Sequence, residues 1–195
     1  MIPFNKDFSE RIIQGDRKAF DELFRLFYSR LCSFANSYLK DRDTAEDMVQ
    51  DAFLLLWERH DTLRPGGNVQ AWLLTVVKNN IINHINRMKR RVQAEQNYAA
   101  RIIRDFNLRL STLELCDPEY LFSAEAEERI LKAVDALSEP CRQVITMSRF
   151  EEMSHKEIAE KLNISVKGVE YHITNALKKL RIDLKEYRSL LFFFV

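Results

Sequence analysis

Apolar residues recur at steps of three and four along most of this chain, a spacing that places them on one face of an α-helix. One such run extends from Phe20 through Leu31 to Tyr38, and another extends from Ala45 to Trp57. The chain has only four glycines and four prolines in 195 residues, so it lacks the turn-forming residues that a β-sandwich or barrel needs. The pattern therefore predicts an all-α fold.

Two segments interrupt the helical spacing. The Pro-Gly-Gly cluster at 64–67 ends the second run, and a third helix is expected to open near Asn68 and to continue into the basic residues 87–91. Residues 97–122 lose the clean period, so we interpret them as a linker with some helical content. Helical spacing resumes beyond this segment, from Ala126. The sequence predicts two small helical domains, 1–96 and 123–188, joined by the linker 97–122 and followed by an apolar tail, 189–195.

Composition excludes several classes of protein. No apolar run approaches the roughly 20 residues that a membrane helix requires, and the N-terminus lacks the layout of a signal peptide. We therefore expect a cytoplasmic chain. Three cysteines, at 32, 116 and 141, stand far apart and outside any CxxC pair, which favours buried free thiols over disulfides or a zinc site.

The net charge of +1 conceals two segments of opposite charge. Residues 41–61 hold seven acids and two arginines, whereas residues 78–91 hold five basic residues and no acid. Asp43 and Glu46 have the spacing of a helix cap and its reciprocal partner. The two segments are either solvated helix faces or surfaces for two different partners.

The most specific local pattern is residues 154–180, which read SHKEIAEKLNISVKGVEYHITNALKKL. Ser154 and Glu157 have the spacing of a capping box, and Ser165 can cap a second, longer helix after a short turn. This arrangement is typical of a helix-turn-helix, whose second helix enters the major groove of DNA. The alternative is an ordinary helical hairpin.

The solvent face of the second helix carries groups able to contact base edges and phosphates. The candidate residues for duplex recognition are Ser165, Lys167, Glu170, Tyr171, Thr174, Asn175, Lys178 and Lys179.

Residues 154–180 resemble region 4 of bacterial sigma factors and, almost as closely, the DNA-binding domain of LuxR-type regulators. The N-terminal half distinguishes the two, because DTAEDMVQDAFLLLWERHDTL followed by NVQAWLLTVVKNNIINHINRMKRR resembles sigma region 2 of the extracytoplasmic-function (ECF) class. The resemblance implies a sigma factor that binds core RNA polymerase and directs promoter-specific initiation through −10 and −35 DNA. A stand-alone LuxR-type regulator and a helical interaction adaptor are the alternatives.

The resemblance also implies a role for each charged segment. The acidic helix would dock on the clamp helices of the largest polymerase subunit through Asp43, Glu46, Asp47, Gln50 and Asp51, with Trp57 expected in the core. The basic helix and the loop before it would bind and open the −10 element, and that loop matches the one that captures a flipped base. The −10 candidates are Arg64, Asn68, Lys78, Asn79, Asn83, Arg87, Lys89, Arg90 and Arg91.

The remaining expectations concern partners and chemistry. The family implies contact with the polymerase flap and control by an anti-sigma factor, and neither a small-molecule substrate nor a cofactor is expected. Asp43, Asp47 and Asp51 could suggest a metal, but a docking face is favoured, and His84 and His172 lack a partner at ligand spacing. With no catalytic motif present, we predict that the chain is not an enzyme.

Two residues of the recognition helix depart from the family pattern. Gly168 stands where threonine is common in the family, and Glu170 stands where many relatives have a basic residue. A carboxylate disfavours phosphate and favours the amino group of cytosine. The promoter sequence of this chain is therefore not expected to copy that of its relatives.

Overall fold

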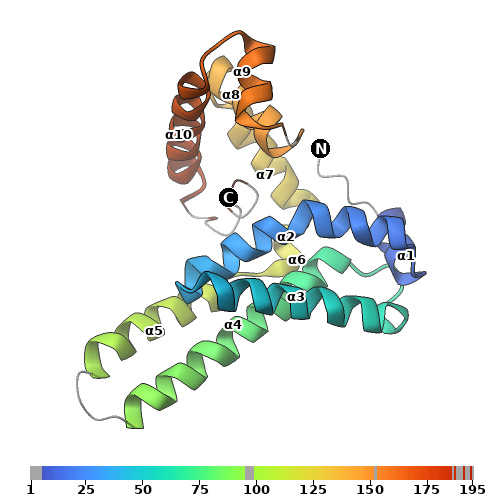
Figure 1. The fold of residues 1–195 in the computed structure, drawn as a ribbon, viewed down its shortest axis with the longest axis vertical. Helices are drawn as coiled ribbons and strands as arrows, with labels where there is room; N and C mark the ends of the chain where they lie inside the picture. The colour runs from blue at the N-terminus through green and yellow to red at the C-terminus, as the bar shows by residue number, and fades with distance from the viewer. Residues whose placement is uncertain are drawn as a thin grey trace. The chain divides into compact units, whose positions relative to one another are not determined.

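The computed structural model describes residues 6–94, 99–151, 153–185, 187, 191 and 194. Helices are the only regular secondary structure among these residues, and the chain forms two compact units, Phe4–Phe122 and Ser123–Val195. Figure 1 shows the helices of each unit. Among the described residues, no helix combines the length and apolar character needed to cross a membrane.

The N-terminal unit contains α1 (Lys6–Ile13), α2 (Arg17–Leu39), α3 (Arg42–Arg59), η1 (His60–Thr62), α4 (Val69–Ala94), α5 (Ala99–Glu114) and α6 (Pro118–Leu121). The long helices α2, α3 and α4 bury the apolar stripes that the sequence predicts. Their fully buried side chains include Leu23, Phe27, Leu31, Val49, Leu56, Leu73, Leu74, Val77 and Ile81.

Aspartate side chains cap the N-termini of α2 and α3. Asp16 caps α2 by accepting the backbone N–H of Lys18, and it also forms an ion pair with Arg11 at 2.7 Å. The cap of α3 is Asp41, whose carboxylate accepts from the backbone N–H and the hydroxyl of Thr44. The expected cap at Asp43 is therefore wrong by two residues, because Asp43 already lies in the first turn of the helix.

Residues 97–122 contain more ordered structure than a linker. Both α5 and α6 pack against α4, and Leu110, Leu113, Cys116 and Leu121 are buried there. Arg109 holds α5 against α2, since its Nη1 donates to the carbonyl oxygen of Tyr38 at 3.0 Å. This segment therefore belongs to the compact N-terminal unit up to Phe122, although part of it, 95–98, lies outside the described residues.

The C-terminal unit contains α7 (Ala124–Asp135), α8 (Glu139–Arg149), α9 (His155–Leu162) and α10 (Val166–Asp183). Its helices α9 and α10 begin after Ser154 and Ser165, as the sequence predicts. In α7 the side chains of Ile130 and Val134 are buried, whereas Leu131 between them is 49% exposed. In the tail, Phe194 is buried with its ring 6.2 Å from that of Phe150, whereas the tail residues 189, 190, 192, 193 and 195 lie outside the described part of the chain.

The three cysteines are free thiols. Cys116 and Cys141 are buried, as expected, and Cys32 is half-buried. Burial raises the pKa of the Cys116 thiol to about 11.

A reciprocal capping box begins α9. The hydroxyl of Ser154 accepts the backbone N–H of Glu157 at 3.3 Å, and the Glu157 carboxylate accepts the backbone N–H of Ser154 at 2.7 Å. The hydrogen bonds from Ser154 lower the pKa of Glu157 below its ordinary value of 4.5. This stabilisation is therefore present above that value and is lost as the pH falls through the lowered pKa.

Removal of this cap gives a first testable prediction. Ser154→Ala deprives the first turn of α9 of an acceptor and is expected to lower the free energy of unfolding of the C-terminal unit by about 1 kcal/mol. Thermal melting followed by circular dichroism measures the change. Ser154→Asp keeps a capping acceptor and should melt like the native protein, so equal losses in both variants would contradict the role of the cap.

Candidate functional sites

The outer face of α3 carries a stripe of carboxylates at intervals of four residues. Asp43, Asp47 and Asp51 are exposed, and within the described residues neither Asp47 nor Asp51 forms an ion pair. Glu46 is instead paired with Arg42 at 2.6 Å, and Gln50 donates to the hydroxyl of Tyr28 at 3.2 Å. We call Asp43, Asp47 and Asp51 the acidic stripe. It presents negative charge to solvent.

An apolar groove of about 480 Å³ adjoins the acidic stripe between α2 and α3. Its exposed apolar side chains are Phe24, Leu54 and Trp57, which are 38%, 56% and 39% exposed. The expectation that Trp57 lies in the core is therefore wrong. The centroid of its ring lies 5.0 Å from that of Phe20, in an edge-to-face arrangement, and 5.5 Å from that of His60, on which it stacks.

The sequence contains a signal for this groove that the apolar spacing alone did not reveal. Leu54, Leu55 and Leu56 are consecutive, and three successive positions of a helix span about 200° of its circumference, so they cannot all face one core. Leu56 is buried and Leu54 points outward. A carboxylate stripe beside exposed aromatic and leucine side chains is a surface suited to a protein partner.

The candidate DNA-binding residues of α4 fall into two groups. Asn79, Asn83, Arg87, Arg90 and Arg91 are exposed, at spacings of three and four that place most of them along one face. We call this set the polar face of α4. It offers amide groups near the middle of the helix and guanidinium groups toward its C-terminal end, so it can contact both bases and phosphates.

Lys78 and Lys89 lie on the side of α4 that contacts α5. The ammonium of Lys78 donates to the carbonyl oxygens of Cys116, at 2.5 Å, and Glu114, at 3.4 Å. Lys89 donates to Oδ1 of Asn107 at 2.7 Å. Both lysines were expected to hold phosphates, whereas in the structure their ammonium groups bind the segment 107–116.

The contact of Lys78 with α5 gives a second prediction. Lys78→Met keeps the aliphatic stem but leaves the carbonyl groups at the end of α5 without their charged donor, so the free energy of unfolding should fall by about 1–3 kcal/mol. Arg87→Met removes an equal charge from the polar face and should change stability by less than about 0.5 kcal/mol. Chemical denaturation measures both, and equal stability of the two variants would contradict the structural role of Lys78.

A tight turn shapes the loop between η1 and α4. The N–H of Gly67 donates to the carbonyl of Arg64 at 2.9 Å, with Pro65 and Gly66 at the centre of the turn. Gly66 has φ +71°, a conformation that side chains disfavour, and a Cβ on Gly67 would lie 2.9 Å from the Arg64 carbonyl oxygen. The Pro-Gly-Gly cluster therefore specifies a type II turn that holds Arg64 and Asn68 on either side of it.

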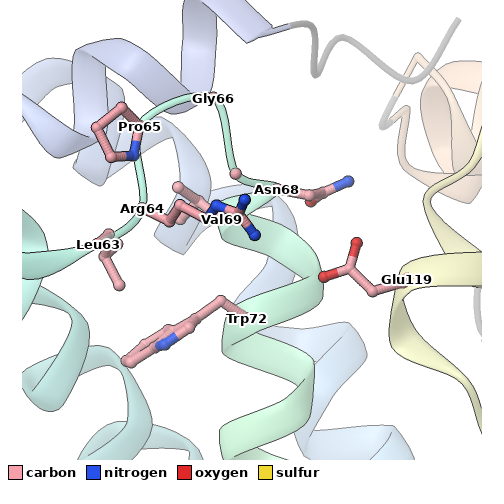
Figure 2. Close-up of a pocket in the computed structure, with 9 residues that line it drawn as sticks. Leu63, Arg64, Pro65, Gly66, Asn68, Val69, Trp72 and Glu119 are labelled. Carbon is pink, nitrogen blue, oxygen red and sulfur yellow. The ribbon is translucent and has the colours of Figure 1, made fainter.

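This loop forms one wall of a pocket of about 630 Å³, which we call the loop pocket (Figure 2). It is lined by Leu63, Arg64, Pro65, Gly66, Gly67, Asn68, Val69, Trp72 and Glu119. Asn68 also caps α4, because its Oδ1 accepts the backbone N–H of Ala71 at 3.0 Å. The structure thus brings together Arg64 and Asn68, as the sequence predicts, and adds Glu119, which sequence reasoning missed.

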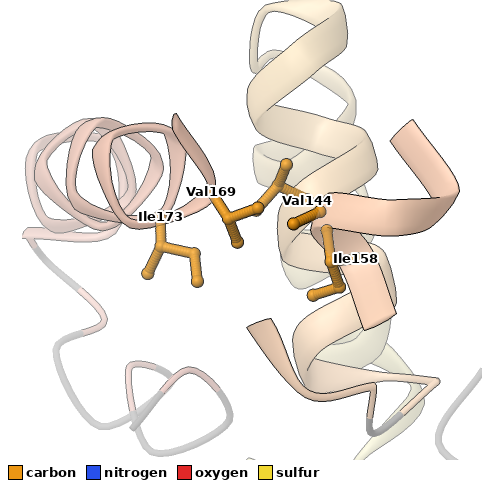
Figure 3. Packing of buried hydrophobic residues seen from close by; sticks show 5 residues of the cluster. Val144, Ile158, Val169 and Ile173 are labelled. Atoms are coloured by element: carbon orange, nitrogen blue, oxygen red, sulfur yellow. The ribbon is translucent and has the colours of Figure 1, made fainter. Parts of the chain in front are cut away.

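The C-terminal unit contains the expected helix-turn-helix. Asn163 ends α9 in a left-handed conformation, with φ 50°, and Ser165 begins α10 by accepting the backbone N–H of Gly168 at 3.0 Å. The two helices are held by the helix-turn-helix core, shown in Figure 3 and formed by Val144, Ile158, Ala159, Val169 and Ile173. The turn and this core together set the orientation of α10 relative to α9.

The face of α10 away from this core is polar. Of the predicted recognition residues, Asn175 is half-buried, and the exposed ones are Ser165, Lys167, Glu170, Tyr171, Thr174, Lys178 and Lys179. Tyr171 is 64% exposed, and Lys179 is paired with Asp183 at 2.8 Å. Gly168 has no steric requirement for glycine, since a Cβ there would meet its nearest neighbour, Ser165 Oγ, at 3.4 Å.

The histidines and acids do not gather into a metal site within the described residues. Burial, followed by the positive charge of Arg87, lowers the pKa of His84. Nδ1 of His172 lies 3.9 Å from Sγ of Cys141.

Two family models match the chain in order. Residues 23–91 match Sigma-70 region 2, and residues 127–180 match Sigma-70, region 4. The first covers α3, the loop pocket except for Glu119, and α4 as far as Arg91, and the second covers the helix-turn-helix as far as Leu180.

Whole-chain comparisons find similar proteins. The chain is 29% identical to RNA polymerase sigma factor NccH of Alcaligenes xylosoxydans xylosoxydans, over 88% of this chain and 90% of that protein. It is 27% identical to the ECF RNA polymerase sigma-E factor of Escherichia coli K12, over 86% of this chain and 87% of that one. The solved structure of CnrH in complex with the cytosolic domain of CnrY aligns with 93% of this chain and 97% of that chain, at 24% identity and a TM-score of 0.37.

Proposed function

Because this chain belongs to the sigma-70 family of RNA polymerase sigma factors, in its extracytoplasmic-function class, we propose a role in transcription initiation for each of its three exposed surfaces. As a sigma factor, it binds core RNA polymerase and directs promoter-specific initiation. The alternative of a stand-alone LuxR-type regulator is not supported, since residues 23–91 match sigma region 2. The observation that carries the proposal is the order of the two sigma regions in one chain, each with its own exposed face.

The acidic stripe and the groove beside it form the proposed docking surface for core polymerase. Asp43, Asp47 and Asp51 would pair with basic side chains of the clamp helices, and Glu46 and Gln50 would extend the contact. Free carboxylates next to exposed apolar groups support this role, because protein interfaces combine an apolar centre with a polar rim. Charge complementarity at the rim would speed association and fix the register of docking.

The polar face of α4 and the loop pocket form the proposed −10 surface. Arg87, Arg90 and Arg91 would neutralise phosphates, a contribution that weakens as salt concentration rises. Asn79 and Asn83 would contact unpaired bases, and the loop pocket would hold a base extruded from the stack. Lys78 and Lys89 could add phosphate contacts only after exchanging their present acceptors on the segment 107–116.

The exposed face of α10 forms the proposed −35 surface. A helix-turn-helix places the N-terminal part of its second helix in the major groove, so Lys167, Glu170 and Tyr171 would lie nearest the bases. Lys178, one turn or more further on, would contact phosphate. Glu170 would favour a cytosine amino group and would disfavour phosphate.

The proposal extends to regulation and location. We infer that the protein acts by binding alone, without catalysis or a cofactor, and that it works in the cytoplasm, where core polymerase is found. The family further implies an anti-sigma factor that would cover the docking surface. Region 4 would also contact the polymerase flap.

The test of this function is reconstitution with core RNA polymerase. Stoichiometric co-purification, followed by run-off transcription from genomic fragments, should yield start sites that core enzyme alone does not use. A folded, inhibitor-free chain that fails to bind core polymerase would contradict the proposal.

Substitutions on α10 give a third prediction, which separates −35 recognition from polymerase binding. Tyr171→Ala with Asn175→Ala should weaken transcription from the selected promoter by about 30-fold or more, because each of the two lost base contacts costs about 1–3 kcal/mol. Co-purification with core polymerase should be unchanged. The native protein must also lose activity on a promoter with a scrambled −35 element, and equal activity on both promoters would contradict the assignment.

A further inference from the structure

One residue of the loop pocket comes from a distant part of the sequence. Glu119 lies in α6, about 50 residues after the loop, and Asp117 fixes the start of that helix by accepting the backbone N–H of Glu119 at 3.0 Å. Pro118 and Leu121 on either side of it are buried, and α6 packs on α4. The backbone at Glu119 is thus anchored while its side chain remains exposed.

The carboxylate of Glu119 has no hydrogen-bond or ion-pair partner among the described residues. Figure 2 shows it pointing from α6 toward the start of α4, where the Arg64 and Asn68 side chains also line the pocket. Since Oδ1 of Asn68 is used to cap α4, the amide nitrogen is the group that remains for a ligand. The pocket therefore presents donors from Arg64 and Asn68 and an unoccupied acceptor from Glu119.

A carboxylate in a DNA-binding pocket is unfavourable unless it receives a specific hydrogen bond, because phosphates repel it. Side-chain carboxylates accept hydrogen bonds from the amino group of cytosine. The exocyclic amino groups of adenine and guanine are donors of the same kind. Thymine has no amino group, and it presents carbonyl oxygens on both sides of its single ring N–H. Thymine would therefore place its carbonyl oxygens, which only accept hydrogen bonds, beside the carboxylate, which also only accepts them.

We propose that Glu119 is a base-specificity residue of the loop pocket, where its carboxylate accepts a hydrogen bond from the amino group of an extruded base and excludes thymine. Arg64 and Asn68 donate to the acceptors of the same base, and Trp72 supplies an aromatic wall next to them. The inference rests on the proposed role of the loop pocket in −10 recognition and extends it to the chemical class of base.

The test uses the full chain assembled with core RNA polymerase and single-stranded 12-nucleotide DNA. A binding sequence is first selected from a random pool, and each position is then replaced in turn by each of the four bases. Affinities are compared for the native chain, Glu119→Gln and Glu114→Gln. Glu114 is a matched control, because its side chain is exposed at the end of α5 and does not line the pocket.

The native holoenzyme should discriminate against thymine at one position by about tenfold, the value expected for a hydrogen bond to a charged group. Glu119→Gln should abolish this discrimination at that position, partly by strengthening binding of the thymine oligonucleotide, while Glu114→Gln should keep it. Unchanged base preference in Glu119→Gln would overturn the proposal.

A loop variant separates failure of this inference from failure of the proposed function. Arg64→Ala should weaken binding of the selected oligonucleotide at least severalfold if the loop pocket holds a base. If Arg64→Ala weakens binding and Glu119→Gln keeps the native preference, only the role of Glu119 is overturned. If Arg64→Ala and Glu119→Gln both bind every oligonucleotide as the native chain does, the loop pocket is not the −10 site, and both proposals fail.

Discussion

Reversing two charges on the acidic stripe, as Asp47→Arg with Asp51→Arg, is expected to weaken binding to core RNA polymerase by about a hundredfold or more. The two carboxylates are exposed, and within the described residues they form no ion pair, so their replacement breaks no contact inside the protein. Arginines at these positions would instead face the basic side chains that the carboxylates are proposed to meet. Like charges brought together at an interface cost several kcal/mol.

A second double variant controls for the change in net charge. Glu10→Arg with Glu114→Arg alters two exposed carboxylates of the same unit by the same total charge, away from α3. Co-purification and a competition assay against the native chain measure core binding, and circular dichroism establishes that both variants keep the helical fold. Native affinity in the Asp47 and Asp51 variant, or an equal loss in both variants, would contradict the docking assignment.

Local sequence signals predicted where the helices that carry these surfaces begin. The serines at 154 and 165 cap their helices because a side-chain oxygen there satisfies a backbone N–H that the helix leaves free. The Pro-Gly-Gly cluster predicted the break before α4 for a similarly local reason, since a positive φ at Gly66 permits the turn. Such features depend on a few neighbouring residues and can be read from sequence.

The features that sequence reasoning missed depend on contacts between distant segments. Ile103, Phe106, Leu110 and Leu113 have helical spacing, but the exposed Ile102 just before them and Leu108 among them obscure it, so α5 was interpreted as linker. With α5 unrecognised, neither the carbonyl partners of Lys78 nor the place of Glu119 in the loop pocket could be predicted. The same limit applies to Trp57, whose exposure depends on how α2 crosses α3.

Candidate residues that face solvent and candidate residues that contact a distant segment need different tests. Residues on the acidic stripe, on the polar face of α4 and on the exposed face of α10 can be changed with little effect on the fold, because their side chains point to solvent. Lys78 cannot, because its ammonium group binds backbone carbonyls that lie partly out of water. A loss of promoter binding on mutation of Lys78 would therefore need a stability measurement before it was assigned to DNA contact.

The helix-turn-helix core provides the second large effect. Val169→Asp would place a carboxylate among Val144, Ile158, Ala159 and Ile173, where Val169 is fully buried. An uncompensated buried charge costs about 3–5 kcal/mol, which approaches the whole stability of a small domain. We expect the C-terminal unit of this variant to be largely unfolded at 37 °C and promoter-directed transcription to be lost.

The same substitution three residues earlier serves as the control. Val166 is 39% exposed in the first turn of α10, where an acidic side chain interacts favourably with the helix dipole, so Val166→Asp should melt close to the native protein. Limited proteolysis and thermal melting distinguish the two variants. Because Val169 and the acidic stripe belong to different compact units, Val169→Asp should still bind core polymerase through α3. Native-like melting of Val169→Asp would show that α9 and α10 do not pack as a helix-turn-helix, and it would remove the physical basis for placing α10 in the −35 groove.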